Sequence, residues 1–539
     1  MPQPADAPAP FDHRRLLFGS PGPLRVQAAV VAAVGLGVPA TLALLVGDAG
    51  HATLVSLGAF TALYAVDRAY PYRARLLGGV AALLVLSVGF GAVVGLVAEH
   101  VAAPGQVWGQ AVVVVGVTGV AALATFLANA LVLGPPGGFF FALAAGMSAQ
   151  LVGHGIPVGT LLGLTVLGAA CAWLASMAPS LWAPHGPVAA RLRIADAAVR
   201  SHLAAYDAGR VTTRTRTDAA LALHGAWGAV AEAGIRDSAT SRALHALHAG
   251  FAASLGSQPV ASAEPDQVAP GPEGAEDRHL AEDIPLGMPS RAYLLRRALH
   301  VDTAPTLLAL RVVVACALAG GLTLVVGTDR PDWAIASAIL VLHSGVDRVL
   351  GTYRALHRLA GTLVGLLLFA AIYAREPSGL LLIAVLVLLQ LVIELVVVRQ
   401  YAVAVVFITA LVLLVTSRPG QAVGHLMEAR LLDTVTGVGV GIVVLWTVGR
   451  RFWREGLPRQ LRRLEAAMGA LREQLRQPGP SAEASLEGRR DLQVELIEAA
   501  RIADTAHRNA PRAAAEHWER HLRLQHEGYA LLASCWTAR

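Results

Sequence analysis

The sequence predicts an all-α, polytopic membrane protein made of two parallel six-helix transmembrane repeats, each followed by a cytoplasmic helical region. Hydrophobic residues make up 55% of the 539-residue chain and charged residues 15%, and the mean hydropathy is +0.56. Many apolar runs approach the roughly 20 residues that a helix needs to cross a bilayer. Landmarks also recur at a nearly constant spacing, 280 residues from Gly47 to Gly327 and 281 from Tyr72 to Tyr353. Such a spacing indicates a duplicated unit.

The pattern of polar residues predicts no enzyme, no cofactor and no metal. The sequence contains no lysine, which excludes P-loop nucleotide hydrolysis, Schiff-base chemistry and kinase chemistry. Its net charge of +6 is typical of arginine-rich cytoplasmic loops in membrane proteins, so we expect no nucleic-acid partner. His517 and His521 lie four residues apart. Without a third ligand they predict a solvated helix face rather than a zinc site.

Composition divides the chain into five regions. The Pro/Ala-rich residues 1–24 are expected to be disordered. A first transmembrane half (25–184) precedes a cytoplasmic helical region (185–305), whose residues 257–288 form a disordered linker rich in Pro, Glu, Ala and Asp. A second transmembrane half (306–449) precedes a cytoplasmic helical C-terminal region (450–539). The first apolar run is too long for a signal peptide and is interpreted as a retained helix.

Each half contains six apolar segments, which together predict twelve spans, although ten stay open because several segments are short. The first six lie at about 25–46, 52–66, 76–97, 108–133, 138–153 and 157–178. The second six lie at about 307–326, 333–346, 359–374, 380–398, 401–416 and 429–448.

Loop charges test this topology independently. With both termini in the cytoplasm, the inner loops contain most of the arginines, among them Arg73, Arg191, Arg296, Arg354 and Arg450. The outer loops contain mostly acidic residues and histidines, with Arg330 and Arg430 among the exceptions. This positive-inside pattern favours a multi-pass protein of the cell (plasma or inner) membrane.

The two soluble regions show helical periodicity. In the first region, helical patterns run through residues 192–206, 213–234 and 238–255, and a basic amphipathic helix covers 290–299. In the second, leucines and one methionine recur alternately every four and three residues from Leu457 to Leu475, the a/d seam of a coiled coil. Two further helices are predicted at 484–509 and 512–536.

The candidate functional residues cluster around the eighth segment. The second segment of each half is short, and paired short segments at corresponding positions indicate the binding site of a transporter. Asp332 and Trp333 open the segment in the second half, with Arg330 beside them. We interpret them as part of a substrate entrance, with Asp332 also a candidate for handling protons. The alternatives are a helix cap for Asp332 and an interfacial anchor for Trp333.

Two further features complete the predicted site. Arg348, Arg354 and Arg358 form a cluster that would collect carboxylates at a cytoplasmic mouth, although the positive-inside rule alone also accounts for them. Glu394 interrupts an apolar run, with Gln390 one turn earlier. Because charge inside a membrane is costly, we take Glu394 as a candidate for proton coupling. Its nearness to the predicted inner interface offers snorkelling as the alternative.

The second half also resembles a known family. Asp332-Trp333, Tyr353-Arg354 and the run from Arg358 to Gly365 resemble the fusaric-acid-resistance-like family of integral membrane proteins, which includes aromatic acid exporters and is related to plant malate channels. The resemblance is closest over about 310–450 and looser in the first half. It implies duplicated six-helix halves with cytoplasmic helical regions, and it assigns no substrate residue with certainty.

These observations predict a transporter, a proton-driven exporter of small organic anions such as aromatic carboxylates. A passive anion channel and a membrane scaffold or sensor that acts through its soluble helices are the alternatives. The lipid bilayer and a small organic anion are the partners that the sequence implies. It leaves the oligomeric state open, a homo-oligomer included.

Overall fold

The computed structural model describes residues 25–47, 51–102, 107–235, 239–256, 291–300, 303–327, 330–343, 345–417, 422–476 and 483–537. Every regular element in these residues is helical, which confirms the all-α membrane fold. The expected disorder of residues 1–24 and 257–288 lies outside the described residues. Eight of the described helices are long and apolar enough to cross a membrane, and four apolar helical segments are shorter.

Each predicted apolar segment coincides with a helix or a run of short helices. In the first half these are α2 (Val26–Leu45), the run η1 (Ala52–Val55), α3 (Ser56–Ala59) and η2 (Phe60–Leu63), α4 (Tyr70–Val101), α5 (Val107–Ala130), α6 (Phe139–Val152) and α7 (Val158–Met177), which η3 (Ala178–Leu181) prolongs. In the second half they are α12 (Ala304–Val326), α13 (Pro331–Leu342), α14 (Arg348–Tyr373), α15 (Gly379–Val396), α16 (Tyr401–Thr416) and α17 (Val423–Thr447).

The short helices α6 and α13 lie inside the membrane region, packed against longer helices. All residues of the 12-residue α13 except Leu340 are buried, and α6 is buried along most of its length. A 12-residue helix is about 18 Å long, well short of the roughly 30 Å hydrocarbon core. Protein rather than lipid surrounds α13, so its ends can lie below the membrane surfaces without exposing backbone to lipid.

The helix pairings of the two halves correspond. In each half the sixth helix packs against the first, second and third, and the third packs against the fifth. The contact between the second and sixth helices uses a glycine both times. A Cβ added to Gly168 would lie 2.0 Å from the Val55 carbonyl oxygen, and one added to Gly437 would lie 2.2 Å from that of Ala334. The duplication itself stays a prediction.

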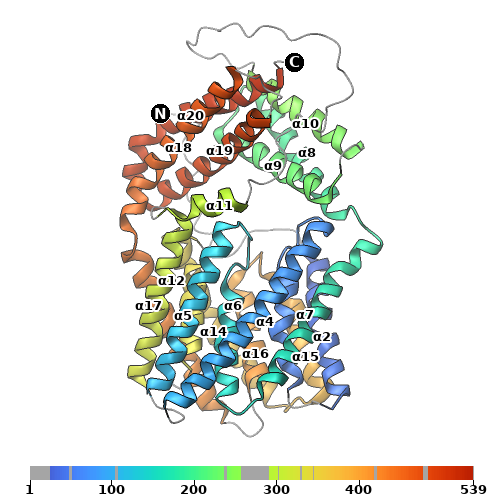
Figure 1. Cartoon of the computed structure of the whole chain (residues 1–539), viewed down its shortest axis with the longest axis vertical. Helices are drawn as coiled ribbons and strands as arrows, with labels where there is room; N and C mark the ends of the chain where they lie inside the picture. Colours follow the sequence, from blue (N-terminus) through green and yellow to red (C-terminus); the bar gives the residue numbers. More distant parts are fainter. Residues whose placement is uncertain are drawn as a thin grey trace.

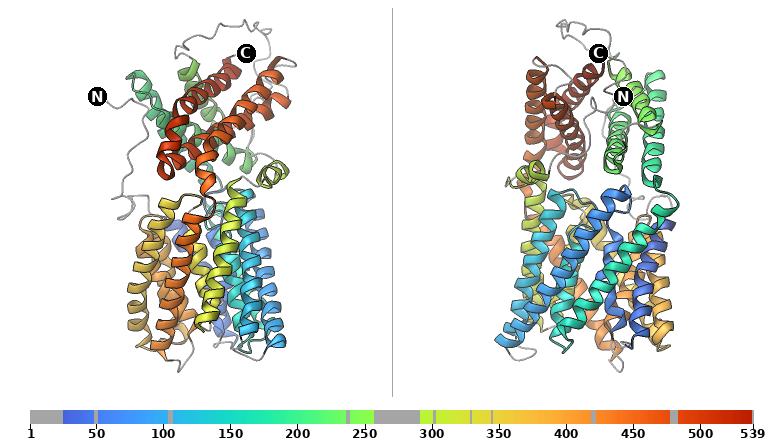
Figure 2. Two further views of the ribbon diagram at one scale, coloured as in Figure 1. Left: turned by 90° about the vertical axis from the view of Figure 1, so that its left-hand side faces the viewer. Right: turned by 45° about the vertical axis from the view of Figure 1, so that its right-hand side comes forward.

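The halves meet through two equivalent contacts. The fourth helix of the first half, α5, packs against α12, the first helix of the second half. The fourth helix of the second half, α15, packs in the same way against α2 (Figures 1 and 2). The fourth helix of each half therefore packs against the first helix of the other half, and the two halves form a single membrane region.

The two soluble regions share one helical bundle on one side of the membrane region (Figure 1). It contains α8 (Gly186–Asp207), α9 (Thr213–Ala233) and α10 (Ala239–Gly256) with α18 (Arg450–Arg476), α19 (Glu483–Asn509) and α20 (Pro511–Thr537). The predicted seam from Leu457 to Leu471 is buried against α19 and α20 inside this bundle. Those residues therefore pack within the chain. We call the membrane face that carries the bundle the proximal face and the opposite one the distal face.

The bundle contacts the membrane region at two equivalent turns. Glu232, near the end of α9, forms an ion pair with Arg68 (2.6 Å) and accepts a hydrogen bond from the backbone of Ala69, just before α4. Arg508, near the end of α19, donates to Asp347 (Nε–Oδ2, 2.7 Å), just before α14. The basic helix α11 (Arg291–Ala298) lies between bundle and membrane region (Figure 2).

Candidate functional site

The candidate site begins at the first turn of α13. Arg330 and Asp332 form a bidentate ion pair there, with Nε–Oδ1 and Nη2–Oδ2 distances of 3.0 Å. The Asp332 side chain is almost fully buried. Its charge also favours the N-terminal end of the helix, where backbone N–H groups lack partners. Gly146 of α6 lies directly beside it, since a Cβ there would be 3.0 Å from the Asp332 Cβ.

Trp333 lies between two guanidinium groups. The Cζ of Arg330 is 4.4 Å from the ring centroid and the Cζ of Arg430 is 4.9 Å from it, distances typical of cation–π contacts. The residue is completely buried and its Nε1 has no hydrogen-bond partner among the described residues. Trp333 is therefore a core residue of the site, and the alternative of a half-wet interfacial anchor is wrong.

Arg358, Arg430 and Asp433 complete a group that we call the charged layer, defined as Arg330, Asp332, Arg358, Arg430 and Asp433. Arg358 comes from α14, and Arg430 and Asp433 come from α17. Both helices pack against α13. Arg430 interacts electrostatically with the other four members. Arg358, Arg430 and Asp433 are all at least 97% buried.

Only some of the hydrogen-bond donors of the Arg358 guanidinium group have a partner among the described residues. It hydrogen-bonds the Tyr401 side chain, but its Nε and Nη1 have no partner among the described residues. An unsatisfied buried donor costs about 1–3 kcal/mol, and more when it is charged. A protein retains such a group when something else binds it or when it has a function.

Two cavities approach the charged layer from opposite faces. The distal cavity has a volume of about 480 Å³ and is lined by Arg330 and Trp333, with His51, His154 and Glu428 at its polar wall. The proximal cavity has a volume of about 630 Å³ and lies between the membrane region and the bundle. The two cavities touch opposite ends of α13, and buried residues of that helix separate them.

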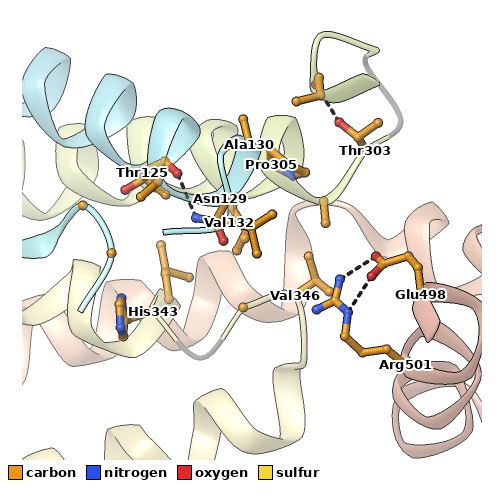
Figure 3. A pocket seen from close by; sticks show the side chains of 18 of the residues that line it. Thr125, Asn129, Ala130, Val132, Thr303, Pro305, His343, Val346, Glu498 and Arg501 are labelled. Atoms are coloured by element: carbon orange, nitrogen blue, oxygen red, sulfur yellow. Dashed lines mark hydrogen bonds and ion pairs between the residues drawn. The ribbon is translucent and has the colours of Figure 1, made fainter. Parts of the chain in front are cut away.

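The proximal cavity is lined by residues from both bodies of the protein. Figure 3 shows His343, at the end of α13, on the membrane side, and Arg501 of α19 on the bundle side, where it is hydrogen-bonded to Glu498 at 2.6 and 3.0 Å. Asn129 donates to the Thr125 carbonyl of its own helix (2.8 Å). Arg354 also lines this cavity, and its Cζ lies 4.5 Å from the Tyr401 ring centroid.

The predicted site residues occupy three places. Asp332, Trp333 and Arg358 lie together in or against the charged layer, and Arg354 lines the proximal cavity. Arg348 lies at the proximal surface, where it contacts Asn509 of α19 and stacks on Trp446 with Cζ 4.5 Å from the ring centroid.

Glu394 lies apart from these residues. It is on α15, which packs against α2, and it accepts a hydrogen bond from Gln390 at 3.5 Å. Its carboxyl group also interacts electrostatically with Arg25 at the start of α2. Glu394 lines neither the distal nor the proximal cavity.

Sequence analysis missed two members of the charged layer. It assigned Arg430 to an outer loop, which is wrong, because α17 begins at Val423 and Arg430 is 3% exposed. It did not single out Asp433. The spacing of Arg430 and Asp433 could have indicated them, since an Arg and an Asp three residues apart lie on one face of a helix beside an apolar run. The polar residues at the start of α17 made this stretch resemble a loop.

The first half has leucines where the second has charges. The spacing of Tyr72 and Tyr353 makes Leu77 the counterpart of Arg358. The shared contact of Gly168 and Gly437 makes Leu161 and Leu164 the counterparts of Arg430 and Asp433. All three leucines are buried. Three of the five charged-layer positions therefore have apolar counterparts in the first half under the predicted duplication.

Comparisons with known proteins match the part of the chain that contains this layer. Residues 315–444 match the sequence model of the family described as "Fusaric acid resistance protein-like", which confirms the predicted resemblance of the second half. The chain is also 27% identical to "Uncharacterized membrane protein YvaC" of Bacillus subtilis (strain 168), over 95% of this chain and 86% of that protein. No solved structure matches.

His517 and His521 differ from the expected solvated face. His521 is 1% exposed and lies in the bundle core, 5.3 Å from Trp518 between ring centroids. His517 is half-buried. Among the described residues, no group of three or more His, Cys, Asp and Glu side chains is arranged to hold a metal.

Proposed function

We propose, from the match of residues 315–444 to the fusaric acid resistance protein-like family, that this membrane protein exports small organic anions. Aromatic carboxylates are the substrate class that we propose. The proposal places the protein in the cell membrane with its bundle in the cytoplasm, and it assigns no catalytic step.

One observation carries the proposal. A layer of three arginines and two aspartates lies between two cavities that reach opposite ends of α13. Positive charge along a route attracts an anion, and the buried layer prevents continuous leakage of solutes. This arrangement fits a carrier whose site opens to one face at a time.

Each residue takes a role according to its position. Arg354 would attract the carboxylate into the proximal cavity, and Arg348 would add to the positive potential at its edge. Arg358 would bind the carboxylate in the charged layer, since its Nε and Nη1 have no partner among the residues described. Trp333 would position the guanidinium groups of Arg330 and Arg430, which lie over its ring.

For proton coupling, Glu394 is the stronger of the two candidates. Asp332 already accepts hydrogen bonds from Nε and Nη2 of Arg330. Glu394 is 9% exposed and its hydrogen bond comes from an uncharged amide, Gln390. A buried carboxyl group without a bidentate cation exchanges its proton more readily.

A passive channel is the second candidate function. It would use the same arginines without coupling, and the distinction is measurable as current. The scaffold alternative has less support, because the seam from Leu457 to Leu471 is buried within the chain. It offers no apolar stripe to a partner.

The test is transport by the purified protein in liposomes. Wild-type protein should carry labelled benzoate-type and aliphatic carboxylates faster under an opposing proton gradient, and Arg358→Gln should reduce the rate to that of empty liposomes. Arg375→Gln, which alters an exposed arginine just beyond the distal end of α14, is the control and should behave as wild type. Absence of carboxylate transport by folded wild-type protein would refute the proposal. Anion current without any proton dependence would favour the channel.

A further inference from the structure

We infer that the charged layer selects anions by valence, and that its formal charge sets a preference for singly charged carboxylates. This inference rests on the proposed function and goes beyond it, because it names the residues that determine which anion is carried. Arg430 and Asp433, which the sequence analysis did not assign to the site, are the specificity-determining pair.

The positive and negative charges of the layer do not balance completely. Arg330 and Asp332 neutralise each other through their bidentate pair. Arg430 has Asp433 three residues further along the same helix and interacts with it electrostatically. Arg358 is then the surplus cation. The layer has a formal net charge of one positive.

The neighbouring helices do not compensate this positive charge. The sequences of α5, α6, α12, α14 and α16 contain no acidic residue. On α17, Glu428 is exposed and lines the distal cavity, where water screens it. Within the described part of the chain, the surplus charge of Arg358 therefore has no acidic partner in the layer beyond those counted.

The surplus positive charge of Arg358 favours the binding of an anion. A buried charge is stable only when paired or hydrogen-bonded, and Arg358 is 2% exposed with Nε and Nη1 unsatisfied. One carboxylate would neutralise the layer and accept a charge-assisted hydrogen bond from Nε or Nη1 of Arg358. A dicarboxylate would bring one excess negative charge into the same buried space.

The experiment changes the charge of the layer without changing side-chain size greatly. Asp433→Asn raises the formal charge to two positive, and the ratio of dicarboxylate to monocarboxylate transport should rise about tenfold or more, because a unit charge a few ångströms away acts strongly at low dielectric. Arg430→Gln lowers it to zero and should abolish transport of both. The double variant Arg430→Gln/Asp433→Asn restores one positive charge and should recover the monocarboxylate preference.

Succinate and benzoate serve as probes in the liposome assay, and Asp67→Asn, at a carboxylate with 63% side-chain exposure, is the control that should leave the ratio unchanged. Recovery by the double variant excludes simple misfolding of the single one. If Asp433→Asn is folded and active with an unchanged ratio, the inference is wrong while the proposed function stands. If wild-type protein transports neither probe nor any other carboxylate, the proposed function itself fails.

Discussion

Two arginines buried in the membrane region show how hydrogen bonding distinguishes a structural side chain from a candidate binding residue. Arg311 of α12 is fully buried, and it donates to the carbonyl oxygens of Val346, Leu445 and Val448 at 3.0–3.3 Å. Those bonds tie the proximal ends of three membrane helices together. Arg358 is as deeply buried but keeps two unsatisfied nitrogens within the described structure. Burial alone would not distinguish them, whereas hydrogen bonding does.

Glu394 provides a prediction at the same scale. Glu394→Gln keeps the size of the side chain and its contact with Gln390 but removes the proton-binding group. Anion transport should continue, and it should lose its dependence on the proton gradient, since a permanently neutral amide cannot exchange protons. The measurement is the transport rate at several imposed pH differences. An unchanged dependence on the gradient would move the coupling role to Asp332 or another group.

At the level of helices, the short central elements are held by close backbone contacts. Gly437 brings α17 against α13 so tightly that its position has no room for a side chain. This contact also fixes the position of α13, whose opposite ends reach the two cavities. The equivalent contact of Gly168 with Val55 positions the short segment of the first half in the same way.

Gly437→Ala should therefore disturb both folding and transport. The added Cβ would meet the Ala334 carbonyl oxygen at 2.2 Å, and overpacking of this kind typically costs about 1–3 kcal/mol. Gly439→Ala, two residues further along α17, is the matched control because its Cβ would meet no atom within 4 Å. Thermal unfolding and liposome transport measure the two effects. Equal behaviour of the two variants would show that the contact does not constrain α13.

At the level of the whole molecule, buried histidines lie in the core that the two soluble regions share. His202 of α8 hydrogen-bonds Ser254 (3.1 Å), and His248 of α10 accepts a hydrogen bond from Trp227 (3.0 Å). His521 belongs to α20 of the second region. Burial, reinforced by Arg216 near His202 and His521 and by Arg489 near His248, lowers the pKa of these histidines to about 4, 3 and 4, for His202, His248 and His521 respectively.

These pKa values predict that acid destabilises the bundle. The unfolded chain binds protons below a histidine pKa of about 6.5, whereas the folded bundle excludes them down to about pH 4. The stabilisation is therefore complete above about pH 6.5 and is lost as the pH falls toward 4, by about 1–2 kcal/mol per histidine at about pH 5. Thermal unfolding of the detergent-solubilised protein, followed by tryptophan fluorescence, should show a lower Tm at the lower pH. His521→Leu should weaken this dependence, and a Tm independent of pH would contradict the assignment.

Much of the fold could be predicted because local composition determines which segments insert into a membrane as helices. The positions of all twelve apolar segments agree with helices, since an apolar run of sufficient length has few alternatives in a bilayer. The candidate site was only partly predictable. Asp332, Trp333 and Arg358 come together, but Arg430 was assigned to a loop and Glu394 lies on another helix pair. Which charged side chains meet depends on helix packing rather than on sequence spacing.

The sequence by itself determined the membrane-spanning helices, the periodicity of the soluble ones and the resemblance of the second half to the fusaric acid resistance protein-like family, because each depends on residues close together in the chain. Only the tertiary structure decided which buried charges come together in one layer, which cavities reach α13 and that the two soluble regions share one core. Those outcomes depend on contacts between residues far apart in the chain, such as Arg430 with Trp333 and Arg508 with Asp347. Local composition determines the helices, and close packing determines which of their side chains form a site.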